Sequence, residues 1–375
     1  MRLGIDAREI QSGAYTGIGK PLVNFLEYFS TIQTNDECVL FSSFPIQHDF
    51  GRNVRNVVIE EASTFVWDQL RLPAAVKREV IDLFYSPYYK IPLFAPCRKI
   101  SSVLDLMYLV FDEYKEQLGP FKRAYYFTFA RYMINSADKV LTCSMYSKDD
   151  IIRLYGIDER KIEVIHLSIG DEFRPVDDSL KLDTIKKRFH IGSRYILYVG
   201  NLKLHKNVAT LIKAFNKIAC EFDDLQLVLA APKEFLYHDL RQLATDLGIG
   251  ERVIFTGKIT SKDKPNLLYN GAELFVFPSL YEGFGLPPVE AMASGVAVVA
   301  SNTTSIPEVI GDAGVLVNPM DVDAIAAAMR SILVDNKLRE SLINKGLRRA
   351  EGFRRKEIAA RMYEFFKRIA YGKEG

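Results

Sequence analysis

The chain alternates short apolar runs with longer segments of helical periodicity, and this alternation constrains its fold more than any other feature. The runs are continuously apolar, which is typical of strands buried on both faces. Strands that alternate with helices predict doubly wound parallel sheets, so we expect an α/β fold. The runs begin at Arg2, Cys38, Asn56, Asp82, Lys99 and Lys139 in the first half, and at Tyr195, Leu225, Arg252, Leu274 and Ala297 in the second.

The length of 375 residues favours two domains over one. The polar stretch IGDEFRPVDDSLKLD has no apolar period and predicts a linker near residues 171–183. We therefore expect two similar Rossmann-like domains, residues 1–175 and 176–355, with a cleft between them. Ligands of such folds bind beyond the carboxyl ends of the strands, so we expect the functional residues in loops that directly follow strands.

Charge and cysteine content narrow the class of protein. A formal net charge of +2 argues against a nucleic-acid binder, which carries a clear basic excess. The cysteines lie far apart in sequence, which gives metal and disulfide frameworks little support and predicts reduced, mostly buried thiols in a cytoplasmic protein. No run approaches the roughly twenty apolar residues of a membrane span, so we expect any membrane contact to be made from the surface. The cysteines are Cys38, Cys97, Cys143 and Cys220.

The stretch PSLYEGFGLPPVEAMASG follows an apolar run that ends near Phe277. Its prolines suit the first turn of a helix, and Gly283 and Gly285 let the backbone turn sharply and approach a ligand. The amides of this turn and the helix N-terminus behind it predict an anion site, flanked by Glu282 and Glu290. The alternative is that the two glutamates only complement the helix dipole or cap backbone amides.

Two further loops follow predicted strands. Residues 200–207, GNLKLHKN, place two lysines directly after a predicted strand. Such cations can stabilise a diphosphate leaving group, whose negative charge grows as its bond to the sugar breaks. The alternative is a solvated turn. We expect His205 to be a surface residue of this loop. The loop after the first strand contains Gly17 and Gly19, but Val23 stands where a dinucleotide fingerprint needs its third glycine. It predicts a flexible phosphate-contacting loop and excludes a nicotinamide-dependent oxidoreductase.

The segment PSLYEGFGLPPVEAMASGVAVVASNTTSIPEVIGDAGVLVNP resembles the signature of the family 4 retaining glycosyltransferases, which have the GT-B fold. TGIGK, VLTCSMYSKDDIIRLYG and YVGNLKLHKN occur in the order expected for that family. The resemblance spans nearly the whole chain. It implies that a C-terminal helix within residues 356–375 crosses back onto the N-terminal, acceptor-binding domain, while the C-terminal domain binds a nucleotide sugar.

The resemblance also implies roles for matching positions. Glu290 holds the ribose of a nucleotide-diphosphate sugar, Glu282 lies close to the transferred sugar, and Lys206 neutralises the diphosphate. The implied reaction retains the anomeric configuration through front-face attack, in which the departing phosphate oxygen takes the acceptor's proton. It needs no protein nucleophile, no metal and no further cofactor. The other implied donor-binding residues are Gly19, Gly200, Asn201, Lys203, Phe284, Gly285 and Leu286.

Two positions depart from the family pattern. Asn201 stands where the family commonly has Arg, and Lys203 would supply that charge without a bidentate fork. Leu104 stands where the family commonly has a His before Asp105, and a leucine cannot hydrogen-bond a sugar hydroxyl. Asp105 remains a candidate catalytic residue that reaches the sugar or the acceptor. These departures keep open a nucleotide-sugar-binding paralogue with little transfer activity, and a sugar epimerase on the same fold is a further alternative.

Further stretches bear on donor and acceptor. GNLKLHKN, and WDQLRLP from Trp67, resemble mannosyltransferases of bacterial surface polysaccharide and lipopolysaccharide assembly, so GDP-mannose is the first expected donor and a UDP-hexose the second. The expected acceptor is a glycan or lipid-linked glycan. The segment from Leu118 mixes aromatic residues with Lys122, Arg123 and Arg131, a composition compatible with contact at the inner face of the membrane, although such helices more often pack their aromatic residues into the domain.

Overall fold

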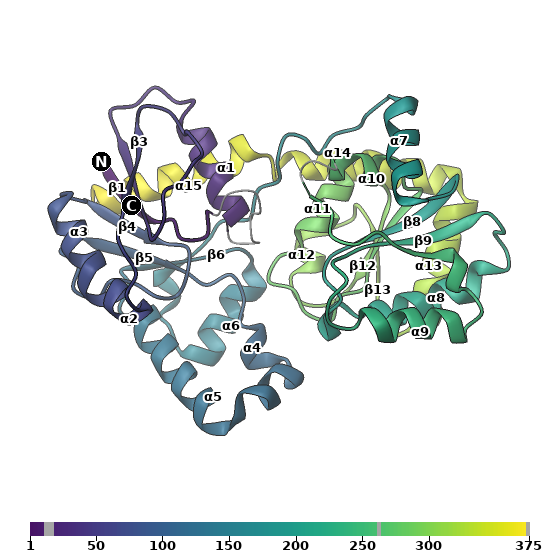
Figure 1. The fold of residues 1–375 in the computed structure, drawn as a ribbon, viewed down its shortest axis with the longest axis horizontal. Helices are drawn as coiled ribbons and strands as arrows, with labels where there is room; N and C mark the ends of the chain where they lie inside the picture. The colour runs from purple at the N-terminus through teal and green to yellow at the C-terminus, as the bar shows by residue number, and fades with distance from the viewer. Residues whose placement is uncertain (11–18, 261–263, 373–375) are drawn as a thin grey trace. The chain divides into compact units, whose positions relative to one another are not determined.

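This computed structural model describes residues 1–10, 19–260 and 264–372. The chain divides into two compact units (Figure 1). Unit 1 comprises residues 1–168 and 355–375, and unit 2 comprises residues 169–354. Each unit is built on a parallel sheet, as the continuously apolar runs predict.

The sheet of unit 1 has the strand order β3-β2-β1-β4-β5-β6-β7 within the described residues, and its paired strands run parallel. The sequence order of the strands reverses between β1 and β4. The central strand β1 is fully buried at Leu3 and Ile5, which explains its lack of polar alternation. The strands are β1 (Arg2–Asp6), β2 (Glu37–Ser42), β3 (Val54–Val58), β4 (Leu83–Ser86), β5 (Arg98–Ser102), β6 (Lys139–Thr142) and β7 (Ile162–Val164).

The helices of unit 1 include the last helix of the chain, α15, which packs against α1. The rings of Phe25 and Phe366 meet edge to face at 5.4 Å, and Tyr363 donates a hydrogen bond of 2.6 Å to Asp36. The predicted return of the C-terminal helix to the N-terminal domain is confirmed. The helices are α1 (Gly19–Phe29), α2 (Thr64–Val66), the π-helical turn η1 (Trp67–Arg71), α3 (Leu72–Arg78), α4 (Met107–Val110), α5 (Asp112–Asn135), α6 (Met145–Tyr155), the 3₁₀ turn η2 (Glu159–Lys161) and α15 (Arg355–Ala370).

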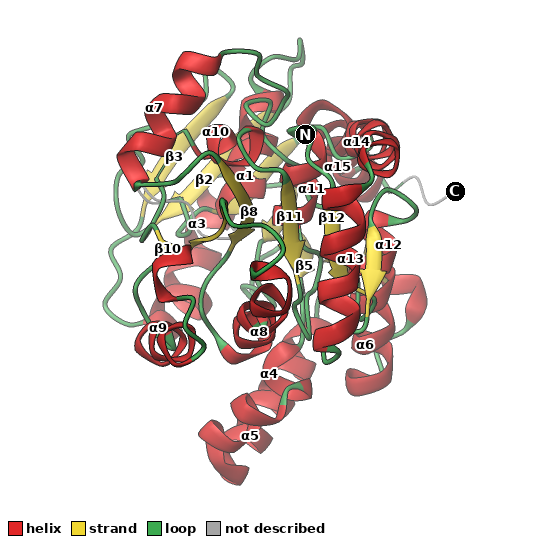
Figure 2. Cartoon of the chain, turned by 90° about the vertical axis from the view of Figure 1, so that its right-hand side faces the viewer, coloured by secondary structure: helices red, strands yellow, loops and turns green. Residues whose placement is uncertain are grey.

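Unit 2 repeats this plan with the strand order β10-β9-β8-β11-β12-β13 among its described residues, and the order reverses between β8 and β11. Helices cover both faces of its sheet (Figure 2). The strands are β8 (Arg194–Val199), β9 (Leu225–Ala230), β10 (Val253–Phe255), β11 (Leu274–Phe277), β12 (Val298–Ser301) and β13 (Val315–Val317). The helices are α7 (Ser179–Phe189), η3 (Leu204–Lys206), α8 (Val208–Ala219), α9 (Tyr237–Asp246), η4 (Gly250–Arg252), α10 (Pro265–Asn270), α11 (Leu286–Ala293), α12 (Ile306–Ile310), α13 (Val322–Val334) and α14 (Asn336–Glu351).

The boundary between the units falls after residue 168, ahead of the predicted position after residue 175. Ile169 donates its N–H to the Phe353 carbonyl at 3.0 Å, and the Arg354 guanidinium donates to the Phe173 carbonyl at 2.7 Å. These bonds attach the start of the predicted linker to unit 2. The linker prediction for residues 171–183 is wrong at its end, because Asp178 caps α7 through the N–H of Lys181.

Every predicted apolar run overlaps a strand, whereas β7 and β13 were not predicted from the sequence. Cys38 and Cys143 are buried, Cys97 is half-buried and Cys220 is exposed, and none of these four described cysteines forms a disulfide. Among the described residues, no helix combines the length and apolar character needed to cross a bilayer.

Candidate functional site

The two loops that the sequence predicted in the second half of the chain lie at one place in unit 2. Residues 200–207 follow β8, and Pro278–Gly285 follow β11. These strands are neighbours, with Ile196 opposite Leu274, and the strand order reverses between them. Open α/β sheets bind ligands in the crevice at such a point.

The loops are joined by an ion pair and by backbone contacts. Lys206 Nζ donates to Glu282 Oε1, and both side chains are 13% exposed. The N–H of Leu280 donates to the His205 carbonyl at 2.7 Å. Asn207 has a left-handed backbone (φ 56°), and its amide donates to the Pro278 carbonyl at 3.2 Å. A cation and a carboxylate are therefore fixed side by side at the exit of two buried strands.

The turn before α11 requires a glycine at position 285. Gly285 has φ 101°, and a Cβ there would lie 2.6 Å from Ile306 Cδ1. The turn is held from behind by Ser305, whose hydroxyl donates to the carbonyls of Glu282 at 2.9 Å and Phe284 at 3.1 Å. The helix then begins at Leu286, as the prolines predicted. Its N-terminal amides, with the dipole behind them, favour an anionic ligand.

Glu290 lies inside α11 and is only 8% exposed. Its Oε2 accepts a hydrogen bond of 2.9 Å from the hydroxyl of Tyr269 in α10. Burial, and then the charge of Glu290, raise the pKa of Tyr269 well above its ordinary value, so the phenol stays protonated and donates. The Tyr269 ring meets Phe173 edge to face at 5.8 Å, which fixes its orientation. Sequence reasoning missed Tyr269, because a tyrosine in the helical run NLLYN gives no local signal of this contact.

His205 is 3% exposed, so the prediction of a surface residue is wrong. The short 3₁₀ turn η3 directs its side chain inward. Burial, and then the charges of Lys206 and Lys203, lower the pKa of His205 to about 3, so its imidazole is neutral. The positive charge of this loop therefore comes from its two lysines.

The other predicted residues of the loop after β8 are Gly200, Asn201 and Lys203, and each has a different local contact. A side chain at Gly200 would meet the Tyr198 hydroxyl at 2.5 Å, which explains the glycine. The Asn201 side chain accepts from the Lys203 N–H at 3.3 Å, so it stabilises its own turn. The Lys203 ammonium lies 5.0 Å from the ring centre of Phe235.

Phe284 contributes its backbone to the turn and its side chain to the core. The ring is 3% exposed and meets Phe353 edge to face at 5.6 Å. Only the amide of Phe284, with those of Gly285 and Leu286, remains a candidate for contact with a ligand.

Gly19 and Asp105, the two predicted residues from the first half, belong to unit 1. Gly19 is buried and opens α1, while Gly17 lies outside the described residues. Asp105 follows β5, and its Oδ1 accepts from the N–H of Met107 at 3.2 Å, at the start of α4. Asp105 therefore stabilises the turn that leads into α4 at the carboxyl edge of the sheet.

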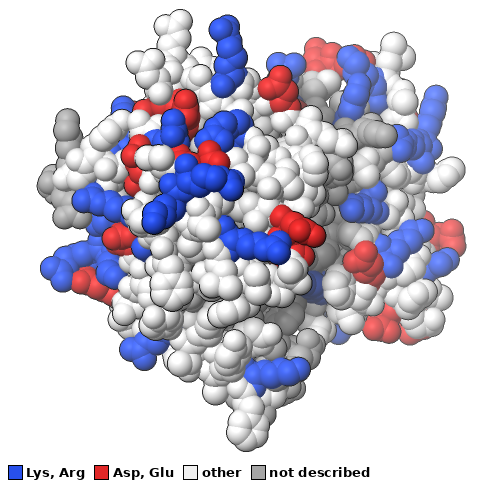
Figure 3. Space-filling view, turned by 60° about the vertical axis from the view of Figure 1, so that its left-hand side comes forward, with Lys and Arg blue, Asp and Glu red and all other residues white. Residues whose placement is uncertain are grey.

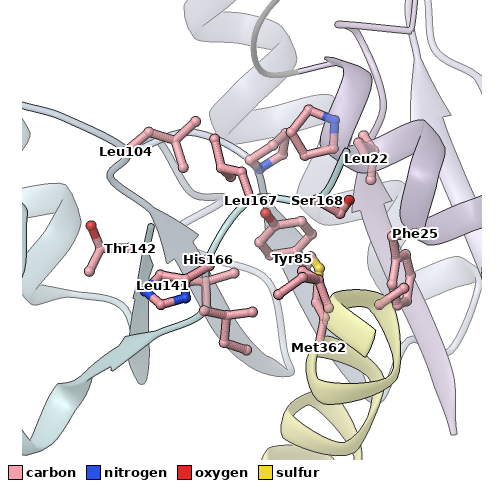
Figure 4. Close-up of a pocket in the computed structure, with 15 residues that line it drawn as sticks. Leu22, Phe25, Tyr85, Leu104, Leu141, Thr142, His166, Leu167, Ser168 and Met362 are labelled. Atoms are coloured by element: carbon pink, nitrogen blue, oxygen red, sulfur yellow. The ribbon is translucent and has the colours of Figure 1, made fainter. Parts of the chain in front are cut away.

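Leu104 lines a small, largely apolar cavity of about 40 Å³ inside unit 1 (Figure 4). Leu22, Phe25 and Tyr85 line the same cavity. The Leu104 carbonyl accepts from the Ser147 hydroxyl at 2.9 Å. Where the family pattern has a histidine, this chain therefore presents a hydrocarbon surface.

Two protein families match this chain, one in each half. The family described as Glycosyltransferase Family 4 matches residues 39–173, and the one described as Glycosyl transferases group 1 matches residues 183–349. The chain belongs to the family 4 glycosyltransferases. The second match contains both loops of the unit 2 site, and the first contains Asp105.

One relative of this glycosyltransferase is O-antigen chain mannosyltransferase B of Escherichia coli, 37% identical over 222 residues, which are 59% of this chain and 58% of the relative. The match thus spans little more than half the length of that protein. Among solved structures, sucrose-phosphate synthase from Thermosynechococcus elongatus has a TM-score of 0.77 at 19% identity, covering 100% of both chains. Anabaena HepE, in complex with UDP-glucose, has a TM-score of 0.77 at 18% identity, covering 98% of this chain and 99% of that one. These likenesses confirm the predicted GT-B fold.

Proposed function

We propose that this glycosyltransferase moves a hexose, mannose in the first instance, from a nucleotide-diphosphate sugar onto a glycan or lipid-linked glycan of a bacterial surface polysaccharide. The observation that carries the proposal is the grouping of Lys206, Glu282 and Glu290 around the glycine turn at the switch point of unit 2. The likeness to an O-antigen mannosyltransferase supports the acceptor class and the sugar.

Each group has a proposed task in donor binding. Glu290 accepts hydrogen bonds from the ribose hydroxyls, and Lys206 exchanges its bond with Glu282 for the diphosphate. Glu282 then turns to the hexose hydroxyls. The amides of Phe284, Gly285 and Leu286 bind the hexose or the diphosphate at the start of α11. Gly200, Asn201 and Lys203 form the opposite wall from the β8 loop, and Lys203 adds a second positive charge.

The proposed reaction retains the anomeric configuration and uses no metal. The bond between the anomeric carbon and the diphosphate oxygen breaks, and the acceptor hydroxyl oxygen bonds to the same face of that carbon. The hydroxyl proton passes to the departing phosphate oxygen, so atoms and charge balance. Lys206 stabilises the negative charge that develops on the leaving group. GDP-mannose is the proposed donor, and a UDP-hexose is the competing outcome.

We assign acceptor binding to unit 1, where Asp105 lies, and donor binding to the unit 2 site, with Gly19 as a proposed donor-binding residue contributed by unit 1. Transfer of labelled sugar from a panel of nucleotide sugars to a bacterial lipid-extract acceptor tests the whole proposal. We expect transfer from GDP-mannose, an α-linked product and no loss of rate with EDTA. Donor binding without transfer or slow donor hydrolysis would indicate the binding paralogue, and conversion of the donor without acceptor would indicate an epimerase.

We further propose that α5 contacts the inner face of the membrane. Phe121, Tyr125 and Tyr132 are 90%, 63% and 60% exposed and share one helix face, whereas Phe127 packs inward against Tyr155 at 5.1 Å. Residues 121–135 contain basic side chains and no acidic one. In Figure 3 the end that carries α5 lies at the bottom of the view; its surface is mostly uncharged, and the charged side chains seen there are Lys and Arg. Exposed aromatic rings flanked by cations suit an anionic lipid surface.

Vesicle co-sedimentation tests this contact. We expect binding to vesicles that contain phosphatidylglycerol, and little binding to phosphatidylcholine alone. Serine at both Phe121 and Tyr125 should abolish it, whereas Phe235→Ser, at a ring that is 61% exposed in unit 2, should not. Equal losses in the two variants would contradict the assignment to α5.

A further inference from the structure

Unit 1 has a switch point of its own, between β1 and β4, and a cavity of about 450 Å³ opens there. The volume falls in the range of small-molecule sites. Loops at the carboxyl ends of three adjacent strands line it, together with residues before and at the start of α2. Its lining includes Arg8 after β1, Phe44 after β2, Tyr88, Tyr89 and Lys90 after β4, and Glu61 before α2.

The floor of this cavity is a preorganised charge cluster. Arg8 donates to both oxygens of Asp6, at 3.0 and 2.6 Å, and to Asp68 at 2.7 Å. Its guanidinium lies 3.8 Å from the ring centre of Trp67. Asp6 is 2% and Asp68 6% exposed. Burying three charges in this way is costly and contributes little to stability that apolar packing would not supply, so a ligand-binding role is the better account.

The balance of charge in the cavity disfavours an anionic ligand. The charged residues that line the cavity are Arg8, Lys90 and Glu61. Asp6 and Asp68 lie behind Arg8 and pair with it, so carboxylates outnumber cations once these partners are included. The guanidinium is already engaged by two aspartates, so it offers no free bidentate fork to a phosphate or carboxylate.

The remaining lining suits a polyhydroxylated ring. Glu61 Oε1 accepts a hydrogen bond of 3.1 Å from Thr64 Oγ1 and lies 3.9 Å from Arg8 Nη1, so both of these contacts among the described residues involve this one oxygen. Burial, and then nearby tyrosines and Asp68, raise the pKa of Tyr89 to about 12, so its hydroxyl stays a donor. Tyrosine rings also offer flat apolar surface to the C–H face of a sugar.

We propose that this cavity binds an uncharged sugar residue of the acceptor glycan, with Glu61 accepting hydrogen bonds from its hydroxyls and a tyrosine ring beneath its apolar face. The assignment of that sugar to the acceptor rests on the proposed function. The presence of a neutral-saccharide site in unit 1 does not, because it follows from the cavity itself.

Saturation-transfer NMR on the full chain without any nucleotide sugar tests the site. The probes are α-mannobiose, cellobiose, glucuronic acid and inorganic phosphate. We expect at least one neutral disaccharide to bind at millimolar concentration, and Glu61→Gln to weaken it about tenfold, since a charged acceptor becomes a neutral amide that accepts weaker hydrogen bonds. The matched control is Glu60→Gln, at a neighbouring side chain that is 91% exposed, which should bind as the wild type does.

The outcomes separate this inference from the transferase proposal. Failure of both neutral disaccharides to bind, equal losses in the two glutamine variants, or tighter binding of phosphate or glucuronate would overturn the inference. Transfer assays bear on the proposed function alone, because saccharide binding is measured without donor. Thermal melting of Glu61→Gln should match the wild type, since the Glu61 side chain is 31% exposed.

Discussion

Replacing Tyr269 with phenylalanine removes one oxygen atom and, with it, the hydrogen bond to Glu290 Oε2. The Tyr269 side chain is fully buried and Glu290 is 8% exposed, so water cannot readily replace the lost donor. A hydrogen bond to a charged group contributes about 1.5–3 kcal/mol, and we expect the free energy of unfolding to fall by that amount. The ring itself keeps its edge-to-face contact with Phe173, so packing is preserved.

The same variant tests whether Tyr269 is a positioning residue for the ribose. If the bond orients Glu290, its loss should weaken GDP binding about tenfold, or about 1.4 kcal/mol, and leave 2′,3′-dideoxy-GDP binding unchanged. Isothermal titration of both nucleotides into wild type and Tyr269→Phe measures this difference. An equal loss for the two nucleotides would show a general disturbance of unit 2 and refute the reasoning. No loss for either would show that Glu290 does not depend on Tyr269.

Other perturbations test the fold around the sites. Gly285→Ala should lower the free energy of unfolding by about 2–3 kcal/mol in urea titration, because it adds a steric clash to a strained φ of 101°. Gly248→Ala, at φ 72° with open space around the Cβ, should cost only about 1 kcal/mol. Phe366→Ala should cost about 3–5 kcal/mol and release α15, seen as loss of helical protection in hydrogen exchange. Burial alone would raise the pKa of Asp36, but hydrogen bonds from the amino terminus and Tyr363 lower it below its ordinary value of 3.8. The ionised Asp36 side chain therefore stabilises the fold fully above pH 3.8, and this contribution is lost as the pH falls through the lowered pKa. Asp36→Asn should therefore destabilise the protein at pH 7 and approach the wild type in strong acid.

The sequence predicted the fold well because doubly buried strands leave a strong local pattern. The runs at Arg2 and Tyr195 are apolar at successive positions, as a central parallel strand requires. The strands β7 and β13 are three residues long, too short to give any period. The end of the linker was mispredicted because α7 is a polar helix, in which Ile185 is the buried residue.

The sequence predicted those site residues that can be recognised within a single loop. Loop position after a strand identified Lys206 and Glu282, which the structure joins in an ion pair. Tyr269 and His205 were missed or misplaced, because their roles depend on contacts with α11 and on burial that no local pattern encodes. The cavity at Arg8 was missed for the same reason, since its walls come from separate loops.

The central claim is that the β8 and β11 loops of unit 2 bind a nucleotide-diphosphate sugar, with Glu290 on the ribose and Glu282 by the hexose. Calorimetry with GDP-mannose, paired with transfer rates, tests it directly in two variants. Glu290→Ala should weaken donor binding about a hundredfold, since two hydrogen bonds to a charged group are lost. Glu282→Gln should lower turnover more than affinity. Unchanged donor affinity and unchanged rate in both variants would contradict the account.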